Sequence, residues 1–96
     1  MTPEVRQPAV AGRFYPGEPD RLQGTVRHCL GARAEALVEA RMVMAPHAGY
    51  VYSGAIAGET YARVVVPASA VVMCPNHTGL GVGRSLWAAG HWQFPG

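Results

Sequence analysis

Two short apolar segments of the sequence end in the same way, and this repeated ending most constrains the fold. Residues 41–45 (RMVMA) lead into Pro46 and His47, and residues 69–74 (SAVVMC) lead into Pro75, Asn76 and His77. Both segments are apolar at successive positions, which is typical of strands covered on both faces of a parallel sheet. We therefore predict two parallel strands, each followed closely by a histidine.

A helix is predicted between these strands. Ser53 is a plausible N-cap, with Tyr50 and Tyr52 in an extended loop before it, and Pro67 ends the helix. One helical stripe is formed by Ile56, Ala57, Thr60, Tyr61 and Val64. The order strand, loop, helix, strand over residues 41–75 is that of a βαβ unit, whose right-handed crossover makes the two strands parallel.

A second helix is predicted nearer the start of the chain. Pro19 just inside the helix and Asp20 in its first turn are N-terminal signals. The apolar face is formed by Leu22, Val26, Cys29 and Leu30. The following residues 31–40 fit either an extension of this helix or a linker, and residues 1–17 and the surroundings of His91 fit loops or turns.

Composition narrows the class of protein. A chain of 96 residues suits one small domain or part of a larger one, and 49% hydrophobic with 15% charged residues is a globular composition. The net charge of +2 is small and its arginines are scattered, so the sequence does not indicate a basic surface for binding nucleic acid. With no signal-peptide pattern and no apolar run near the ~20 residues of a membrane span, we expect a soluble, cytoplasmic protein without membrane contact. We expect Cys29 and Cys74 to be free thiols in a reducing compartment rather than a structural disulfide.

The two histidines fall where a ligand site is expected. Parallel strands end at the same edge of the sheet, and ligands of open α/β sheets bind beyond that edge. Imidazoles of His47 and His77 would suit Zn, Cu, Fe or Ni, but a mononuclear centre usually takes a third protein ligand. The alternative is that each histidine is an ordinary polar residue after a strand. A dinucleotide site is disfavoured because the glycines of residues 79–83 have the spacing G-x-G-x-G rather than G-x-G-x-x-G.

Three motifs of the sequence are PAVAGRFYP (residues 8–16), APHAGYVYSGAIAG (residues 45–58) and CPNHTGLG (residues 74–81). Together they resemble the Memo family, whose members in many prokaryotes are called AmmeMemoRadiSam system protein B. WAAGHWQFPG (residues 87–96) loosely resembles the next family segment and departs from it at its end.

The resemblance implies a three-layer α/β/α sandwich similar to class III extradiol dioxygenases. Residues 1–96 would be the N-terminal part of one such domain, truncated to the βαβ unit and the preceding helix. His47 and His77 would be metal ligands, and Phe14 and Tyr52 would line the same pocket. The metal would be a divalent transition ion, iron or copper before zinc, held weakly because a further ligand lies far toward the family C-terminus.

Three functions are compatible with this resemblance. The first is a metal-dependent redox enzyme related to the non-haem iron dioxygenases. The second is a non-catalytic adaptor module whose pocket binds a small molecule, a peptide or a tyrosine-containing partner. The third is a fragment without activity. The name of the prokaryotic members implies a functional association with AMMECR-type and radical SAM proteins.

Overall fold

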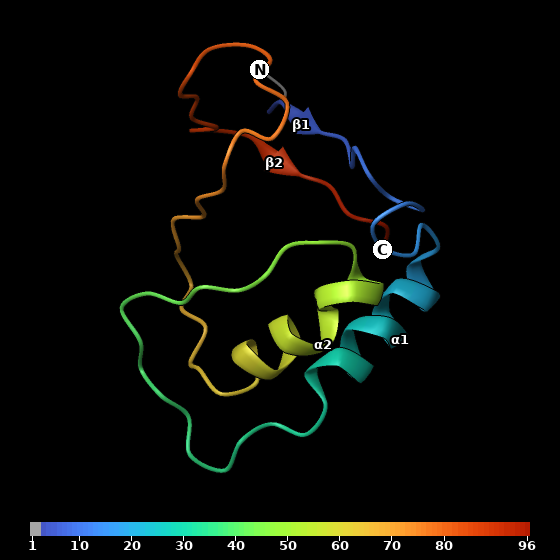
Figure 1. Cartoon of the computed structure of the whole chain (residues 1–96), viewed down its shortest axis with the longest axis vertical. Coiled ribbons are helices and arrows are strands. Elements are labelled where there is room, and N and C mark those ends of the chain that lie inside the picture. Colours follow the sequence, from blue (N-terminus) through green and yellow to red (C-terminus); the bar gives the residue numbers. More distant parts are fainter. Residues whose placement is uncertain (1–2) are drawn as a thin grey trace.

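The computed structural model describes residues 3–96 and contains two helices and a small sheet (Figure 1). Helices α1 (Pro19–Leu30) and α2 (Tyr50–Tyr61) pack against each other. Strands β1 (Val5–Arg6) and β2 (His91–Trp92) pair in parallel, with Val5 opposite His91. The chain is therefore α/β, as the sequence predicts, but both strands lie in segments that the sequence had indicated as loops.

Helix α1 begins where its sequence predicts, and its end settles the two alternatives for the residues that follow. The Glu18 carboxylate caps its start by accepting hydrogen bonds from the backbone N–H groups of Asp20 (3.0 Å) and Arg21 (2.9 Å), which satisfies donors that the helix itself cannot pair. Gly31 ends the helix with a φ of 58°, a conformation that glycine adopts without steric cost. Residues 31–40 are therefore a linker and not an extension of α1.

Helix α2 begins earlier than predicted. Tyr50 and Tyr52 lie in its first turn rather than in an extended loop, and Gly49 is its N-cap. The prediction of Ser53 as N-cap was wrong, because its hydroxyl lies inside the helix and donates to the Ala48 carbonyl at 3.0 Å. With no side-chain cap at its start, α2 depends on tertiary contacts.

The contact between the two helices is made close by two glycines of α2. Gly54 and Gly58 are buried against Cys29 of α1. A β-carbon at position 54 would lie 3.0 Å from the Cys29 sulfur, and one at position 58 would overlap the Cys29 carbonyl. Leu22 and Ala62 are the buried hydrophobic residues of the described chain, so the core is small and lies along this helix crossing.

The two strands predicted from the apolar segments 41–45 and 69–74 are not present, so the predicted βαβ unit was wrong in its strands. The side chains of residues 71–73 are between 85 and 88% exposed, and Met44 is 91% exposed. Strands of this composition need neighbouring strands and covering layers, and residues 3–96 supply neither at these segments. A single parallel bridge, Val38 with Val64, is formed beside them.

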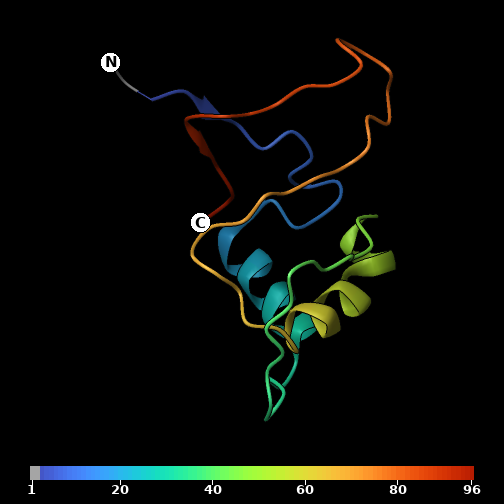
Figure 2. The ribbon, with the colours of Figure 1, turned by 90° about the vertical axis from the view of Figure 1, so that its left-hand side faces the viewer.

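The small sheet lies apart from the helix pair (Figures 1 and 2). Its edge carries the guanidinium of Arg6, 4.5 Å from the ring centre of Trp92 and 6.0 Å from that of Trp87. Long connections join the two parts, and the radius of gyration of 14.9 Å exceeds the ~12.5 Å of a compact chain of this length. Within residues 3–96, no helix is long and apolar enough to cross a membrane.

Candidate functional site

His47 and His77 lie in direct contact, although they are 30 positions apart in the sequence. Their Nε2 atoms are 2.9 Å apart, and their ring centres are 5.1 Å apart with an angle of 46° between the rings. Both residues are exposed. The structure thus brings together the two histidines that the sequence predicted at one edge of a sheet. We call them the histidine pair.

His47, the first residue of the histidine pair, lies in a loop that is hydrogen-bonded to α2. Ser53, only 7% exposed, donates to the carbonyl of Ala48, the residue after His47. The backbone N–H of Tyr50 donates to the carbonyl of Phe14 at 2.8 Å, so the loop near the start of the chain also contacts this helix end. His47 is therefore one residue away from backbone that is hydrogen-bonded to a helix.

The second member lies in a loop organised by a neighbouring side chain. The Asn76 amide oxygen accepts hydrogen bonds from the backbone N–H groups of Thr78 (3.2 Å) and Gly79 (2.9 Å), and its NH2 group donates to the Leu80 carbonyl at 3.1 Å. His77 lies inside this turn. Asn76 carried no predicted role, although an asparagine shortly before Thr-Gly is a turn signal.

The spacing of the two nitrogens allows two chemical states. Without an ion, the Nε2–H group of one imidazole can donate to an unprotonated Nε2 of the other. With an ion, the two Nε2 atoms would be its nitrogen ligands. Among residues 3–96, no group of three or more His, Cys, Asp or Glu side chains is arranged to hold a metal.

The two aromatic residues expected to line the pocket both approach Gly49, Phe14 with its backbone and Tyr52 with its side chain. A β-carbon at Gly49 would be 3.5 Å from the Phe14 carbonyl oxygen and 3.7 Å from Cδ2 of Tyr52. The Tyr52 side chain is 85% exposed and that of Phe14 48%, so neither lies in an enclosed cavity here. Their assignment to the pocket stays a prediction.

Tyr50, at the start of α2, lies near Tyr15 and Cys29. Its ring centre is 5.6 Å from that of Tyr15. Burial raises the pKa of the Tyr50 phenol, and the nearby Tyr15 and Cys29 raise it further. The neutral phenol is therefore the favoured form at this helix start.

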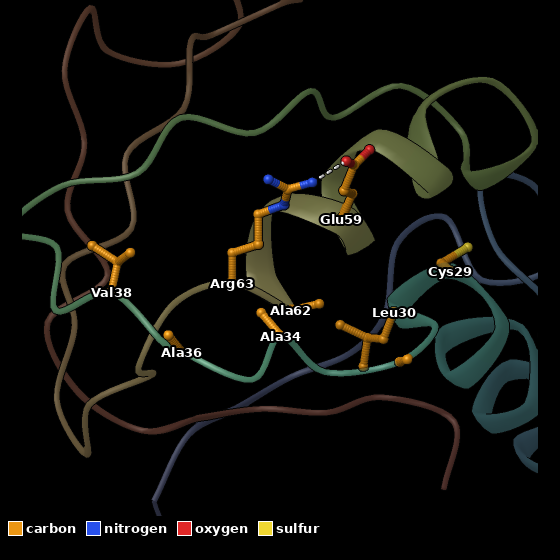
Figure 3. Close-up of a pocket in the computed structure, with 9 residues that line it drawn as sticks. Cys29, Leu30, Ala34, Ala36, Val38, Glu59, Ala62 and Arg63 are labelled. Atoms are coloured by element: carbon orange, nitrogen blue, oxygen red, sulfur yellow. Dashed lines mark hydrogen bonds and ion pairs between the residues drawn. The ribbon is translucent and has the colours of Figure 1, made fainter.

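A shallow cavity lies away from the histidine pair, at the end of the helix crossing (Figure 3). Its volume is about 530 Å³, and small side chains of the 31–38 linker form much of its wall. The Arg63 guanidinium and the Glu59 carboxylate, 2.6 Å apart, form an exposed ion pair at its edge. The cavity is lined by Cys29, Leu30, Ala32, Ala34, Ala36, Val38, Glu59, Ala62 and Arg63. It contains neither member of the histidine pair and is wide open.

Comparison with known proteins places these features in a family. The family model described as Memo-like protein matches residues 6–96. A MEMO1 family protein of Aquifex aeolicus is 40% identical over 91 residues, covering 95% of this chain and 34% of that relative. One of Methanothermobacter thermautotrophicus is 41% identical over 102 residues, covering 95% and 37%.

The chain spans about a third of the length of these curated relatives. No solved structure gave a significant match. The matched region includes both members of the histidine pair and the α1–α2 crossing. The chain therefore belongs to the Memo family.

Proposed function

We propose that His47 and His77 are two ligands of a divalent transition-metal centre in a redox protein related to the non-haem iron dioxygenases. The observation that supports this proposal is the 2.9 Å separation of the two Nε2 atoms. Two imidazoles on separate loops, each aimed at the other from a different part of the chain, form the nitrogen part of a 2-His-1-carboxylate or related site. Iron or copper is the preferred ion, and zinc also accepts these ligands.

The protein would supply geometry rather than a complete coordination sphere. Exposed imidazoles leave several positions around the ion open to water or to a substrate, and a third protein ligand would come from beyond residues 3–96. A bound iron or copper ion would supply electron transfer and activation of oxygen. The Phe14 backbone and the Tyr52 side chain lie near Gly49 in the loop of His47, and the aromatic side chains of these two residues would form the wall of the substrate pocket.

We infer that the complete family fold is the α/β/α sandwich of class III extradiol dioxygenases. The support is the composition of residues 41–45 and 69–74, which are apolar at successive positions yet exposed here. Such segments become stable strands when further strands and a second helical layer cover them. In that arrangement both histidines would follow strand ends at one edge of the sheet.

Metal titration of the purified chain tests this function. We expect weak binding of Fe²⁺ (under nitrogen) or Cu²⁺ by isothermal titration calorimetry, because two ligands on exposed loops do not fix the geometry of an ion. His47→Ala and His77→Ala should each abolish the heat of binding. His28→Ala, which removes another exposed histidine from α1, is the matched control and should bind like the wild type.

Two results would contradict the proposal. Tight stoichiometric binding that survives His47→Ala would place the ligands elsewhere in the chain. Metal binding without oxygen consumption in a full-length relative supplied with reductant and candidate phenols would favour the non-catalytic adaptor function instead.

A further inference from the structure

The loop that carries His77 receives almost no support from burial. The preceding Val71, Val72 and Met73 are at least 85% exposed, and Leu80 after the loop is 76% exposed. A loop without packed neighbours samples many conformations, and each ordered residue costs about 1–2 kcal/mol of conformational entropy. Some other interaction must therefore limit the directions in which the His77 imidazole points.

Hydrogen bonds from one side chain fill this role. The Asn76 amide oxygen accepts from two successive backbone N–H groups, those of Thr78 and Gly79, and also from the Thr78 hydroxyl at 3.3 Å. Its NH2 group reaches the Leu80 carbonyl on the far side of the turn. The backbone on the C-terminal side of His77 is thus tied to the residue immediately before it.

We propose that Asn76 is a positioning residue, which holds the backbone of His77 so that its imidazole meets that of His47. The inference deepens the proposed metal function and rests on it for its metal readout. The loop of His47 is held in another way, by the hydrogen bond from Ser53 of α2 to the Ala48 carbonyl. One proposed ligand is thus positioned by a helix and the other by Asn76. The acceptor oxygen of Asn76 makes most of these contacts and is the atom on which the geometry depends.

Two substitutions separate the atoms of Asn76. Asn76→Ala removes both the acceptor and the donor. Asn76→Asp keeps an acceptor oxygen for the Thr78 and Gly79 N–H groups, replaces the donor to Leu80 with a second acceptor oxygen and adds a negative charge. Gln93→Ala is the control, because it removes an exposed side-chain amide away from the His77 loop. The side chain of Gln93 makes a 3.1 Å hydrogen bond with that of Gln7 at the small sheet.

The first measurement needs no metal. In the wild type, nuclear Overhauser contacts between the ring protons of His47 and His77 should be seen, because their ring centres are 5.1 Å apart. We expect these contacts to disappear in Asn76→Ala and to persist in Asn76→Asp and Gln93→Ala. Far-UV circular dichroism should be the same for all four proteins, because the loop lies outside both helices.

The second measurement uses Cu²⁺. Electron paramagnetic resonance of the wild type should show coupling to two imidazole nitrogens, and calorimetry should show about 10-fold weaker binding for Asn76→Ala, the usual cost of losing a group that orients a ligand. Asn76→Asp should retain the two-nitrogen spectrum. A loss of thermal stability alone would leave the number of coupled nitrogens unchanged, so this spectrum distinguishes positioning from a general structural role.

Each outcome decides one of the two proposals. If Asn76→Ala keeps both the ring contacts and the two-nitrogen spectrum, Asn76 does not position His77. Loss of both in Asn76→Asp would overturn the assignment to the acceptor oxygen. A wild type that shows the ring contacts but no two-nitrogen copper spectrum would contradict the metal function. The ring contacts of the variants would still test whether Asn76 positions His77.

Discussion

At the level of single residues, Tyr50 links pH to stability. Its pKa lies above the usual value of 10.0, first because of burial and then because of Tyr15 and Cys29. The folded chain therefore holds the phenol proton more tightly than the unfolded chain does. The resulting stability is complete below pH 10 and is lost as the pH rises through the folded-state pKa.

We predict that Tyr50→Phe removes part of the alkaline loss of stability. Thermal melts between pH 8 and pH 11 should show a falling melting temperature in the wild type and a shallower fall in the variant. Tyr61→Phe is the control, because this exposed tyrosine should leave the slope unchanged. An equal slope for wild type and Tyr50→Phe would contradict the prediction.

The proximity of the histidine pair could be predicted from the sequence, because both histidines follow apolar segments that end in proline. The prediction placed each histidine after a strand of a βαβ unit, and the two residues are in contact here although neither strand is present. Ser53 was misplaced because serine is favoured at N-caps, whereas here the Tyr50 N–H finds a carbonyl of the Phe14 loop instead. Asn76 had no predicted role, although its place shortly before Thr-Gly is a local turn signal that could have indicated its contacts.

At the level of elements, the helices were more predictable than the strands. The apolar stripe of α1 and its Pro19 start are local signals, and a helix satisfies its own backbone. The strands predicted at 41–45 and 69–74 depend on distant partners, and composition cannot show whether these are present. Strands β1 and β2 have two residues each and leave no periodic pattern to detect.

We predict opposite effects for two glycine-to-alanine changes in the helices. Gly58→Ala should destabilise the helix pair by about 1–3 kcal/mol, because the new methyl group meets the Cys29 backbone, which cannot rotate away. Gly24→Ala, which has nothing within 4 Å of its β-carbon position, should stabilise α1 by up to about 1 kcal/mol through helix propensity. Urea unfolding followed by far-UV circular dichroism compares the two. Equal effects would show that the close helix crossing is absent in solution.

At the level of the whole molecule, exposed apolar segments dominate the expected behaviour. Met42, Met44 and residues 71–73 are all at least 85% exposed, and exposed segments of high strand propensity favour association. The described chain also has a small core, with Leu22 and Ala62 as its buried hydrophobic residues. We therefore expect oligomers on size-exclusion chromatography and a broad thermal transition.

We predict that joining the unmatched part of the Aquifex aeolicus relative to Gly96 would stabilise the chain more than any single substitution. The added residues would cover the segments 41–45 and 69–74, and hydrogen exchange at their backbone N–H groups should slow markedly. An equally long unrelated domain joined at Gly96 is the control. A sharp melt of the monomeric 96-residue chain alone would contradict this prediction and the inference that further residues cover segments 41–45 and 69–74.

Because the small sheet lies apart from the helices, different spectroscopic signals follow the two parts of the molecule. Both tryptophans, Trp87 and Trp92, lie beside Arg6 of β1, and the helices contain none. Intrinsic fluorescence therefore follows the sheet, whereas ellipticity at 222 nm follows α1 and α2. The two optical signals come from different parts of one chain. The difference between their transition temperatures on heating therefore measures how strongly those parts are coupled.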